Sequence, residues 1–274
     1  MPDAMQCQDR RPALPEADVR PLAHSPIELV VFELLLLAPV DPLTAAAILR
    51  IQECLAASGR PMDRMEPAQR RSLHLKQEPG QEPEVIIGDE AQGWTLSTAD
   101  ESVSASIFAD AIHVQVNGSA EWNHSLRPTL TGLLEGLANT ADPPGVRRVG
   151  LRYVNRLTDR DASSPQDWKG RVENTLLGPV LHPDLGKAVL GAQQQIDLAW
   201  EDGARGVLRH GPFKDGAIAG AVSYLLDIDI SDPASGTFDV GRVLTVADGL
   251  HLAAVSVFQA ALTTEYLEAL RGEA

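Results

Sequence analysis

The sequence predicts an α+β protein in which an antiparallel sheet is covered by long helices, and three observations lead to this fold class. Short segments suited to strands recur about every ten residues and are separated by turn residues. Two long segments, 122–138 and 244–271, repeat apolar residues with the period of an amphipathic helix. The order also repeats, because each half contains a strand, a helix, several strands and a helix. Two β-α-β(n)-α halves are therefore expected, as a helix-grip or TATA-binding-like pseudo-duplication.

The first half is expected over residues 25–145, after a disordered leader, 1–24, that is rich in charges and prolines. A run of leucines and β-branched residues at 25–37 predicts a buried strand. Asp41 and Pro42 have the residue types of a helix N-cap and first turn, so a helix is expected from there to about Ser58. The other elements expected are short strands and a closing helix, at 72–77, 83–87, 93–97, 102–108, 112–116 and 122–138.

The second half is expected over residues 146–274, either as a second domain or as part of one continuous domain. Alternating apolar and polar residues at 148–157 predict a strand that could pair with the first strand of the other half. A helix, three strands and a long final helix are then expected at 165–177, 187–200, 206–210, 219–230 and 244–271.

Composition excludes several classes of protein. The 274 residues include 23 Lys and Arg against 38 Asp and Glu, a net charge of -15, which argues against a nucleic-acid partner. Two cysteines cannot form a disulfide framework or a cysteine-based zinc site, so a reducing compartment is expected. The N-terminus has no apolar signal segment, and the longest apolar run, 29–40, is too short to span a bilayer. We therefore expect a cytoplasmic protein without a membrane partner.

The candidate site is centred on the strand at 148–157. Its period of two places Arg148, Arg152 and Arg156 on one face of the sheet. Buried charges need partners, and suitable carboxylates occur at Asp227, Asp229 and Glu28. Two interpretations remain open. The charges form a structural ladder of ion pairs between strands, or they line a cleft that binds a ligand or a peptide terminus. Paired Asp227 and Asp229 also leave a catalytic or Mg²⁺-binding role open.

Further candidates complete the set of ligand- or peptide-binding residues. His251 lies early in the last amphipathic helix, and Trp94 is one of four tryptophans that could anchor a groove. Tyr153 and Asn155 belong to the arginine-bearing strand. No catalytic residue, cofactor or metal site is predicted. The histidines are scattered, and the sequence contains no nucleophile elbow, no P-loop and no dinucleotide-binding glycine motif.

The opening Pro26-Ile27-Glu28 and the stretch Gly150-Leu151-Arg152-Tyr153-Val154-Asn155-Arg156 carry a resemblance to a known family. Together with Leu250-His251 in the last helix, they resemble a sporadically distributed, largely uncharacterised bacterial family of about this length. The resemblance covers most of the chain after the leader. Some relatives accompany genes for peptide natural products or defence, which implies an accessory role and brings no catalytic residues with it.

Three functions are compatible with this composition, these candidate residues and this resemblance. The first is a non-catalytic accessory protein that binds a peptide or protein by strand addition or in a groove, in a natural-product pathway. The second is an enzyme with a cleft lined by arginine and aspartate. The third is a self-associating immunity or defence protein, in which the apolar first strand and the last helix form a homodimer interface.

Overall fold

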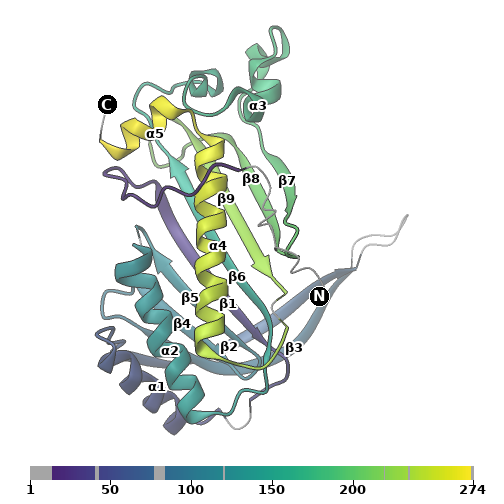
Figure 1. Ribbon diagram of the computed structural model, residues 1–274. Coiled ribbons are helices and arrows are strands. Elements are labelled where there is room, and N and C mark those ends of the chain that lie inside the picture. Colours follow the sequence, from purple (N-terminus) through teal and green to yellow (C-terminus); the bar gives the residue numbers. More distant parts are fainter. Residues whose placement is uncertain are drawn as a thin grey trace, which may run out of the picture. The chain divides into compact units, whose positions relative to one another are not determined.

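The computed structural model describes residues 14–40, 43–76, 84–119, 121–218, 220–233 and 235–272. The described strands form a nine-stranded antiparallel sheet in the order β2-β3-β4-β5-β1-β6-β9-β8-β7 (Figure 1). This confirms the α+β prediction. The strands are β1 Ile27–Leu36, β2 Arg64–Lys76, β3 Glu84–Ser97, β4 Val103–Phe108, β5 Ala111–Asn117, β6 Val146–Leu157, β7 Gln194–Ala199, β8 Arg205–Lys214 and β9 Val222–Asp232.

The described helices include three α-helices of 13, 14 and 22 residues, one of eight residues, several short turns and one π-helical turn. They are α1 Ala45–Ala57, η1 Trp122–Leu126 (π), α2 Arg127–Thr140, η2 Pro165–Trp168 (3-10), α3 Asn174–Leu177, η3 Gly178–Leu181 (3-10), η4 Leu185–Ala188 (3-10), α4 Val240–Ala261 and α5 Thr264–Arg271. Among the described residues, α4 is long and apolar enough to cross a membrane by length and composition, a criterion that core helices of soluble proteins also meet.

The chain divides into two compact units, and neither is a single stretch of sequence. The terminal unit comprises Met1–Glu28, Leu151–Pro233 and Asp248–Ala274, and the central unit comprises Leu29–Gly150 and Ala234–Ala247. Of the leader predicted at 1–24, residues 1–13 lie outside the described part. Within the described part, the main-chain N–H of Asp18 donates to the Gln259 side chain, and the Arg271 guanidinium donates to the Asp18 carboxylate.

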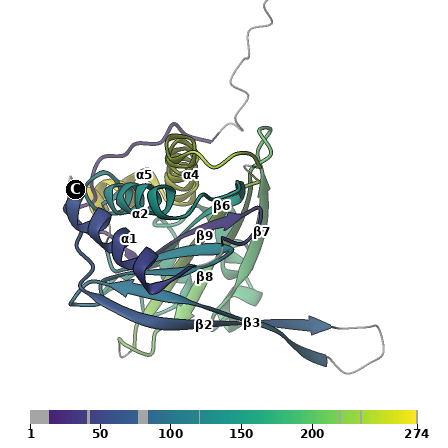
Figure 2. The same ribbon diagram turned by 90° about the horizontal axis from the view of Figure 1, so that it is seen from below.

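In the central unit, α1 and α2 lie side by side against the strands (Figures 1 and 2). Alternate residues of β1 are buried, which is the pattern of a strand with one face on the core. The two helices approach closely because α2 presents Gly132 and Gly136 to α1. A Cβ atom added to Gly136 would lie 2.9 Å from the Cα atom of Ile51, too close for an undisturbed contact.

In the terminal unit, an aromatic cluster forms part of the core. Trp168 is fully buried and donates its indole N–H to the carbonyl of Val222. Its ring contacts those of Tyr224 and Tyr266, with centroids 5.4 and 6.1 Å away. Because Tyr266 lies on α5, this cluster attaches the last helix to β9.

The predictions of two helices, at 165–177 and 244–271, are wrong in their extent. The single helix predicted at 165–177 is replaced by η2 and α3, because Gly170 lies between them with a φ of 82°, in the left-handed region. The helix predicted at 244–271 is interrupted between α4 and α5. Thr263 caps α5 by accepting a hydrogen bond from the Tyr266 N–H, and its own main-chain N–H donates to the carbonyl of Arg171.

Other boundaries differ from the predictions more modestly. The helix α1 is capped by Thr44, whose hydroxyl accepts from the Ala47 N–H, whereas the predicted cap Asp41 lies outside the described residues. The strands predicted at 83–87 and 93–97 belong to one long strand, β3. The strand predicted at 187–200 is shorter, since η4 occupies its first residues. The pseudo-duplication of the two halves stays a prediction.

Candidate functional site

The predicted alternation of β6 is confirmed. Arg148, Arg152 and Arg156 are partly exposed on one face, whereas Tyr153 and Asn155 are buried on the other. This period of two separates charged side chains from the helix-covered core, and it holds in both units, to which β6 contributes residues.

Arg152 makes a two-pronged ion pair with Asp227 of β9. Its Nε and Nη2 atoms donate to the two carboxylate oxygens over 2.7 and 2.8 Å. Arg209 of β8 also donates to Asp227, over 3.4 Å. The Asp227 side chain is only 5% exposed, and hydrogen bonding to it raises the pKa of the Arg152 guanidinium. Asp227 is therefore fully engaged by two arginines.

Arg156 binds two carboxylates, Glu28 and Asp215. Its Nη1 donates to Glu28 over 2.9 Å, and its Nε donates to Asp215 over 2.8 Å. The hydroxyl of Ser223 and the main-chain N–H of Ala217 donate to the same Asp215 carboxylate. Hydrogen bonds from Ser223 and then Arg156 lower the pKa of Asp215 to about 2, so it is charged at neutral pH.

Arg148, the third arginine of the strand, pairs with Glu33 of β1 within the central unit. His113 of β5 lies 3.7 Å from the same carboxylate, and β5 is the strand that pairs with β1. Each arginine of the stripe on β6 therefore contacts a carboxylate of a neighbouring strand, β1 or β9. The predicted ladder of ion pairs describes these contacts.

On the opposite face, Tyr153 lies against His251 of α4. The Tyr153 hydroxyl and His251 Nδ1 are 2.9 Å apart. Burial raises the pKa of Tyr153 and lowers that of His251 to about 4, with Asp248 opposing the second shift in part. A neutral imidazole paired with a neutral phenol in this position joins α4 to the sheet.

The other predicted residues lie apart from these pairs. Asn155 donates to the carbonyl of Leu226 and is 3% exposed. Trp94 lies in the central unit, where its indole N–H donates to the carbonyl of Leu43 over 3.4 Å. Asp229 is partly exposed and acts on Arg152 only through its charge. The structure therefore divides the predicted set between two faces and two units.

Sequence reasoning missed Asp215, Ser223 and Arg209. Asp215 follows β8 in a Lys-Asp-Gly turn, a composition that indicates a turn but not a buried charge. In the part of the chain that the structure describes, no group of three His, Cys, Asp or Glu residues is placed to bind a metal ion. With its carboxylates engaged by arginines, the charged face of the terminal unit holds strands together.

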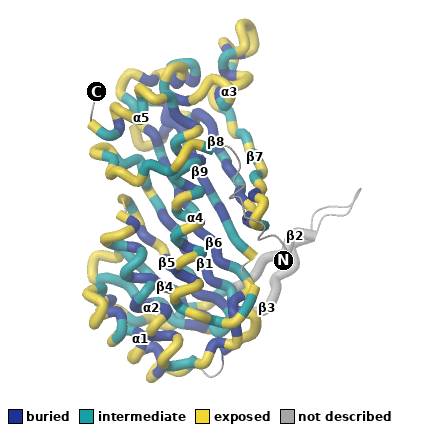
Figure 3. The backbone as a smooth tube through the Cα atoms, in the orientation of Figure 1, coloured by how far each residue is buried: buried dark blue, intermediate teal, exposed yellow. Residues whose placement is uncertain are grey.

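The outer edge of β7 differs from this closed network. Among the described strands, β7 pairs with β8 alone and ends the strand order. Its residues alternate between half-buried and exposed, which is visible along the tube in Figure 3. Two exposed leucines, Leu185 and Leu190, precede β7 in the chain, and Leu190 is 85% exposed. A strand with one neighbour leaves half of its main-chain groups available to another chain.

Comparisons with known proteins add a likeness too weak to carry an argument. No protein-family model matches the chain, and no curated protein matches it. Among solved structures, the chain is similar to the S. pombe Pct1 RNA triphosphatase, with 10% identity over 92% of this chain and 87% of that chain and a TM-score of 0.13. The same enzyme in complex with the Spt5 CTD gives 9% identity over 93% and 88% of the two chains, with a TM-score of 0.12.

Proposed function

We propose that this protein is a non-catalytic, peptide-binding accessory protein that adds an extended peptide to the free edge of β7. The observation that carries the proposal is the open edge of that strand. An added strand gains main-chain hydrogen bonds along its length, while its alternate side chains decide specificity.

The two terminal strands of the sheet support this choice of edge. Proteins often protect an edge strand with proline or with charged residues, lysine above all, which discourage pairing with other chains. The sequence of β2 follows that rule, because it contains Pro67 and four basic residues. The sequence of β7, Gln-Gln-Ile-Asp-Leu-Ala, contains no proline and no basic residue, and its one charged residue is Asp197. An edge that carries a single acidic residue fits a strand that pairs with a basic partner.

Side chains near the edge suggest the chemistry of the peptide. Asp197 is exposed in the middle of β7, and one of its oxygens has only the weak contact of Gln195 at 3.2 Å. Opposite charges on facing residues of paired strands are favourable, so a lysine or arginine opposite Asp197 is expected. Leu185 and Leu190 are exposed, precede the strand in the chain and offer apolar contacts. The proposed ligand is therefore a basic, partly apolar peptide.

The test is selection from a random ten-residue peptide library, followed by titration of a labelled selected peptide. Selected peptides should alternate apolar residues with lysine or arginine. Substitution of Asp197→Lys should weaken binding about fivefold to tenfold, because it replaces attraction by repulsion at a facing pair. If a neighbouring gene encodes a peptide, as the family resemblance implies, that peptide is the natural second probe.

The matched control is Glu201→Lys, which makes the same charge reversal on an exposed residue just after β7. Binding that survives Asp197→Lys, or a library that yields no binder, would contradict the proposal. Pairing of β7 with β7 of a second copy would instead appear in light scattering as a dimer.

A further inference from the structure

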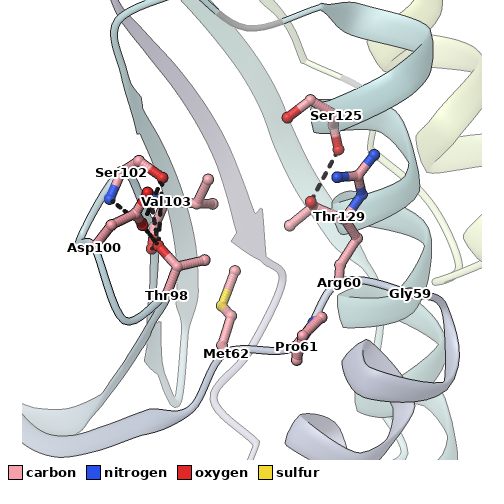
Figure 4. Close-up of a pocket in the computed structure, with 10 residues that line it drawn as sticks. All are labelled: Gly59, Arg60, Pro61, Met62, Thr98, Asp100, Ser102, Val103, Ser125 and Thr129. Atoms are coloured by element: carbon pink, nitrogen blue, oxygen red, sulfur yellow. Dashed lines mark hydrogen bonds between the residues drawn. The ribbon is translucent and has the colours of Figure 1, made fainter.

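A second feature lies in the central unit, away from the charged face of β6. Three segments surround a cavity of about 320 Å³, which we call the Arg60 pocket. It is lined by Gly59, Arg60, Pro61, Met62, Thr98, Asp100, Ser102, Val103, Ser125 and Thr129. Figure 4 shows Arg60 beside Ser125 and Thr129, with Thr98, Asp100 and Ser102 across from them. This volume suits a small molecule.

The end of α1 holds Arg60 in place. Gly59 adopts a φ of 76°, its N–H donates to the carbonyl of Ala56, and the N–H of Arg60 donates to the carbonyl of Leu55. These two bonds form a Schellman motif, which fixes the main chain of the residue after the glycine. Among the described residues, no hydrogen bond or ion pair engages the guanidinium of Arg60. Its five N–H donors are available to a ligand.

The turn between β3 and β4 holds the opposite charge. Asp100 Oδ1 accepts hydrogen bonds from the Thr98 hydroxyl, the Ser102 hydroxyl and the Ser102 N–H, over 2.6, 2.8 and 3.1 Å. These bonds lower the pKa of Asp100 to about 2. Its second oxygen, Oδ2, has no hydrogen-bond partner in the described part of the chain. A fixed carboxylate thus retains unused acceptor capacity.

We propose that the Arg60 pocket binds a small zwitterion, a free α-amino acid with an apolar side chain. The Arg60 guanidinium donates two hydrogen bonds to the carboxylate of the ligand, and the Ser125 hydroxyl donates a third. Asp100 accepts a hydrogen bond from the ammonium group of the ligand. Arg60 and Asp100 line one cavity, and no ion pair joins them in the described part of the chain, so a ligand that carries both charges satisfies both. A phosphate dianion fits less well, because Asp100 repels it.

Two apolar residues of the lining favour an apolar side chain on the ligand. Met62 is 2% exposed, and Val103 is partly buried. The carbonyl of Met62 also accepts from the Gln52 side chain, which ties this segment to α1. Burial of apolar surface against these residues stabilises leucine or methionine over a polar amino acid.

Calorimetric titration with L-leucine tests this inference, alongside N-acetyl-L-leucine, L-leucinamide and inorganic phosphate. Leucine should bind, whereas the two derivatives, each lacking one charge, should bind about tenfold more weakly. Arg60→Gln and Asp100→Asn should each weaken leucine binding about tenfold or more. Arg50→Gln, an exposed arginine of α1 outside the pocket, is the matched control and should bind leucine unchanged.

Three results would overturn the zwitterion site. The first is the absence of a heat of binding for leucine and methionine up to about 10 mM, a range that reveals even a millimolar complex. The second is binding of phosphate as tight as that of leucine. The third is unchanged leucine binding in Arg60→Gln. Circular dichroism of each variant confirms that it is folded. The Asp197→Lys variant should bind leucine normally, so failure of this site and failure of the peptide edge are distinguishable.

Discussion

At the residue scale, Asp227 explains how a cationic stripe lies on a strand of an acidic protein. Its nearly buried carboxylate accepts from Arg152 and Arg209, whose side chains remain 42% and 33% exposed. The arginine stems cover the sheet face while their charged ends reach both solvent and carboxylate. Removal of the carboxylate would leave two arginines without their acceptor.

Asp227→Asn should therefore lower the free energy of unfolding by about 1–2 kcal/mol. The loss is modest because solvent partly screens the two arginine charges that lose their carboxylate. Urea denaturation at neutral pH measures this change. Asp229→Asn is the matched control on the same face of β9, where no side-chain hydrogen bond is lost, and should change stability by less than about 0.5 kcal/mol. Equal effects of the two substitutions would refute the special role of Asp227.

His251 makes stability depend on pH. Its pKa falls from 6.5 in the unfolded chain to about 4 in the folded protein because of burial. Between these values the unfolded chain binds a proton that the folded protein does not, so this contribution to stability is present above pH 6.5 and is lost as the pH falls toward 4. Acidification across this window should thus destabilise the fold through His251.

His251→Gln keeps a polar partner for Tyr153 but cannot titrate. Over the same pH window, the variant should lose roughly 1–3 kcal/mol less stability than the parent protein. Denaturant midpoints at a series of pH values measure the difference. His24→Gln, at an exposed histidine, should keep the parent slope. A parental slope in His251→Gln would disprove the linkage.

At the element scale, contacts made far along the chain decide where helices begin and end. The apolar period from 244 to 271 continues through Thr263, yet the chain turns there into α5 (Figure 1). Segment 170–173 pairs with residues 261–263: the N–H of Glu173 donates to Ala261, and the Thr263 hydroxyl donates to Gly170. The apolar period of the sequence does not reveal an end of a helix that is stabilised by a segment far away in the chain.

The contact of α1 with α2 makes a second element-scale prediction. Gly136→Ala should lower the free energy of unfolding by about 1–3 kcal/mol, because the added methyl group meets the main chain of Ile51. Gly249→Ala in α4 is the matched control, since nothing lies within 4 Å of its added Cβ. That substitution should instead stabilise by about 0.5–1 kcal/mol through helix propensity. Thermal unfolding distinguishes the opposite signs.

At the scale of the whole molecule, the net charge of -15 belongs to a protein whose arginine stripe on β6 is paired with carboxylates. Arg148, Arg152 and Arg156 of β6 are each paired with a carboxylate, so the stripe does not form a free cationic surface for an acidic partner. An acidic exterior instead attracts basic ligands over distance. This agrees with the basic peptide proposed for the edge of β7.

The elements that could be predicted are those whose local sequence repeats apolar residues with the period of a strand or a helix. The strands 25–37 and 148–157 were predicted to within a few residues, and the buried face of the second was confirmed. Pairing of Arg152 with Asp227 was among the alternatives left open. Asp215 and the Arg60 pocket were not predicted, because each depends on turns whose residues have no periodic pattern.

The local pattern of residues was enough to predict which side chains of β6 share a face, because the period of a strand is a local property of the main chain. Which carboxylate each arginine contacts depends on the folded structure. The partners of Arg152 and Arg156 lie 75, 59 and 128 residues away along the chain. Such pairs form when strands dock in one register, and that register depends on the burial of the opposite, apolar face.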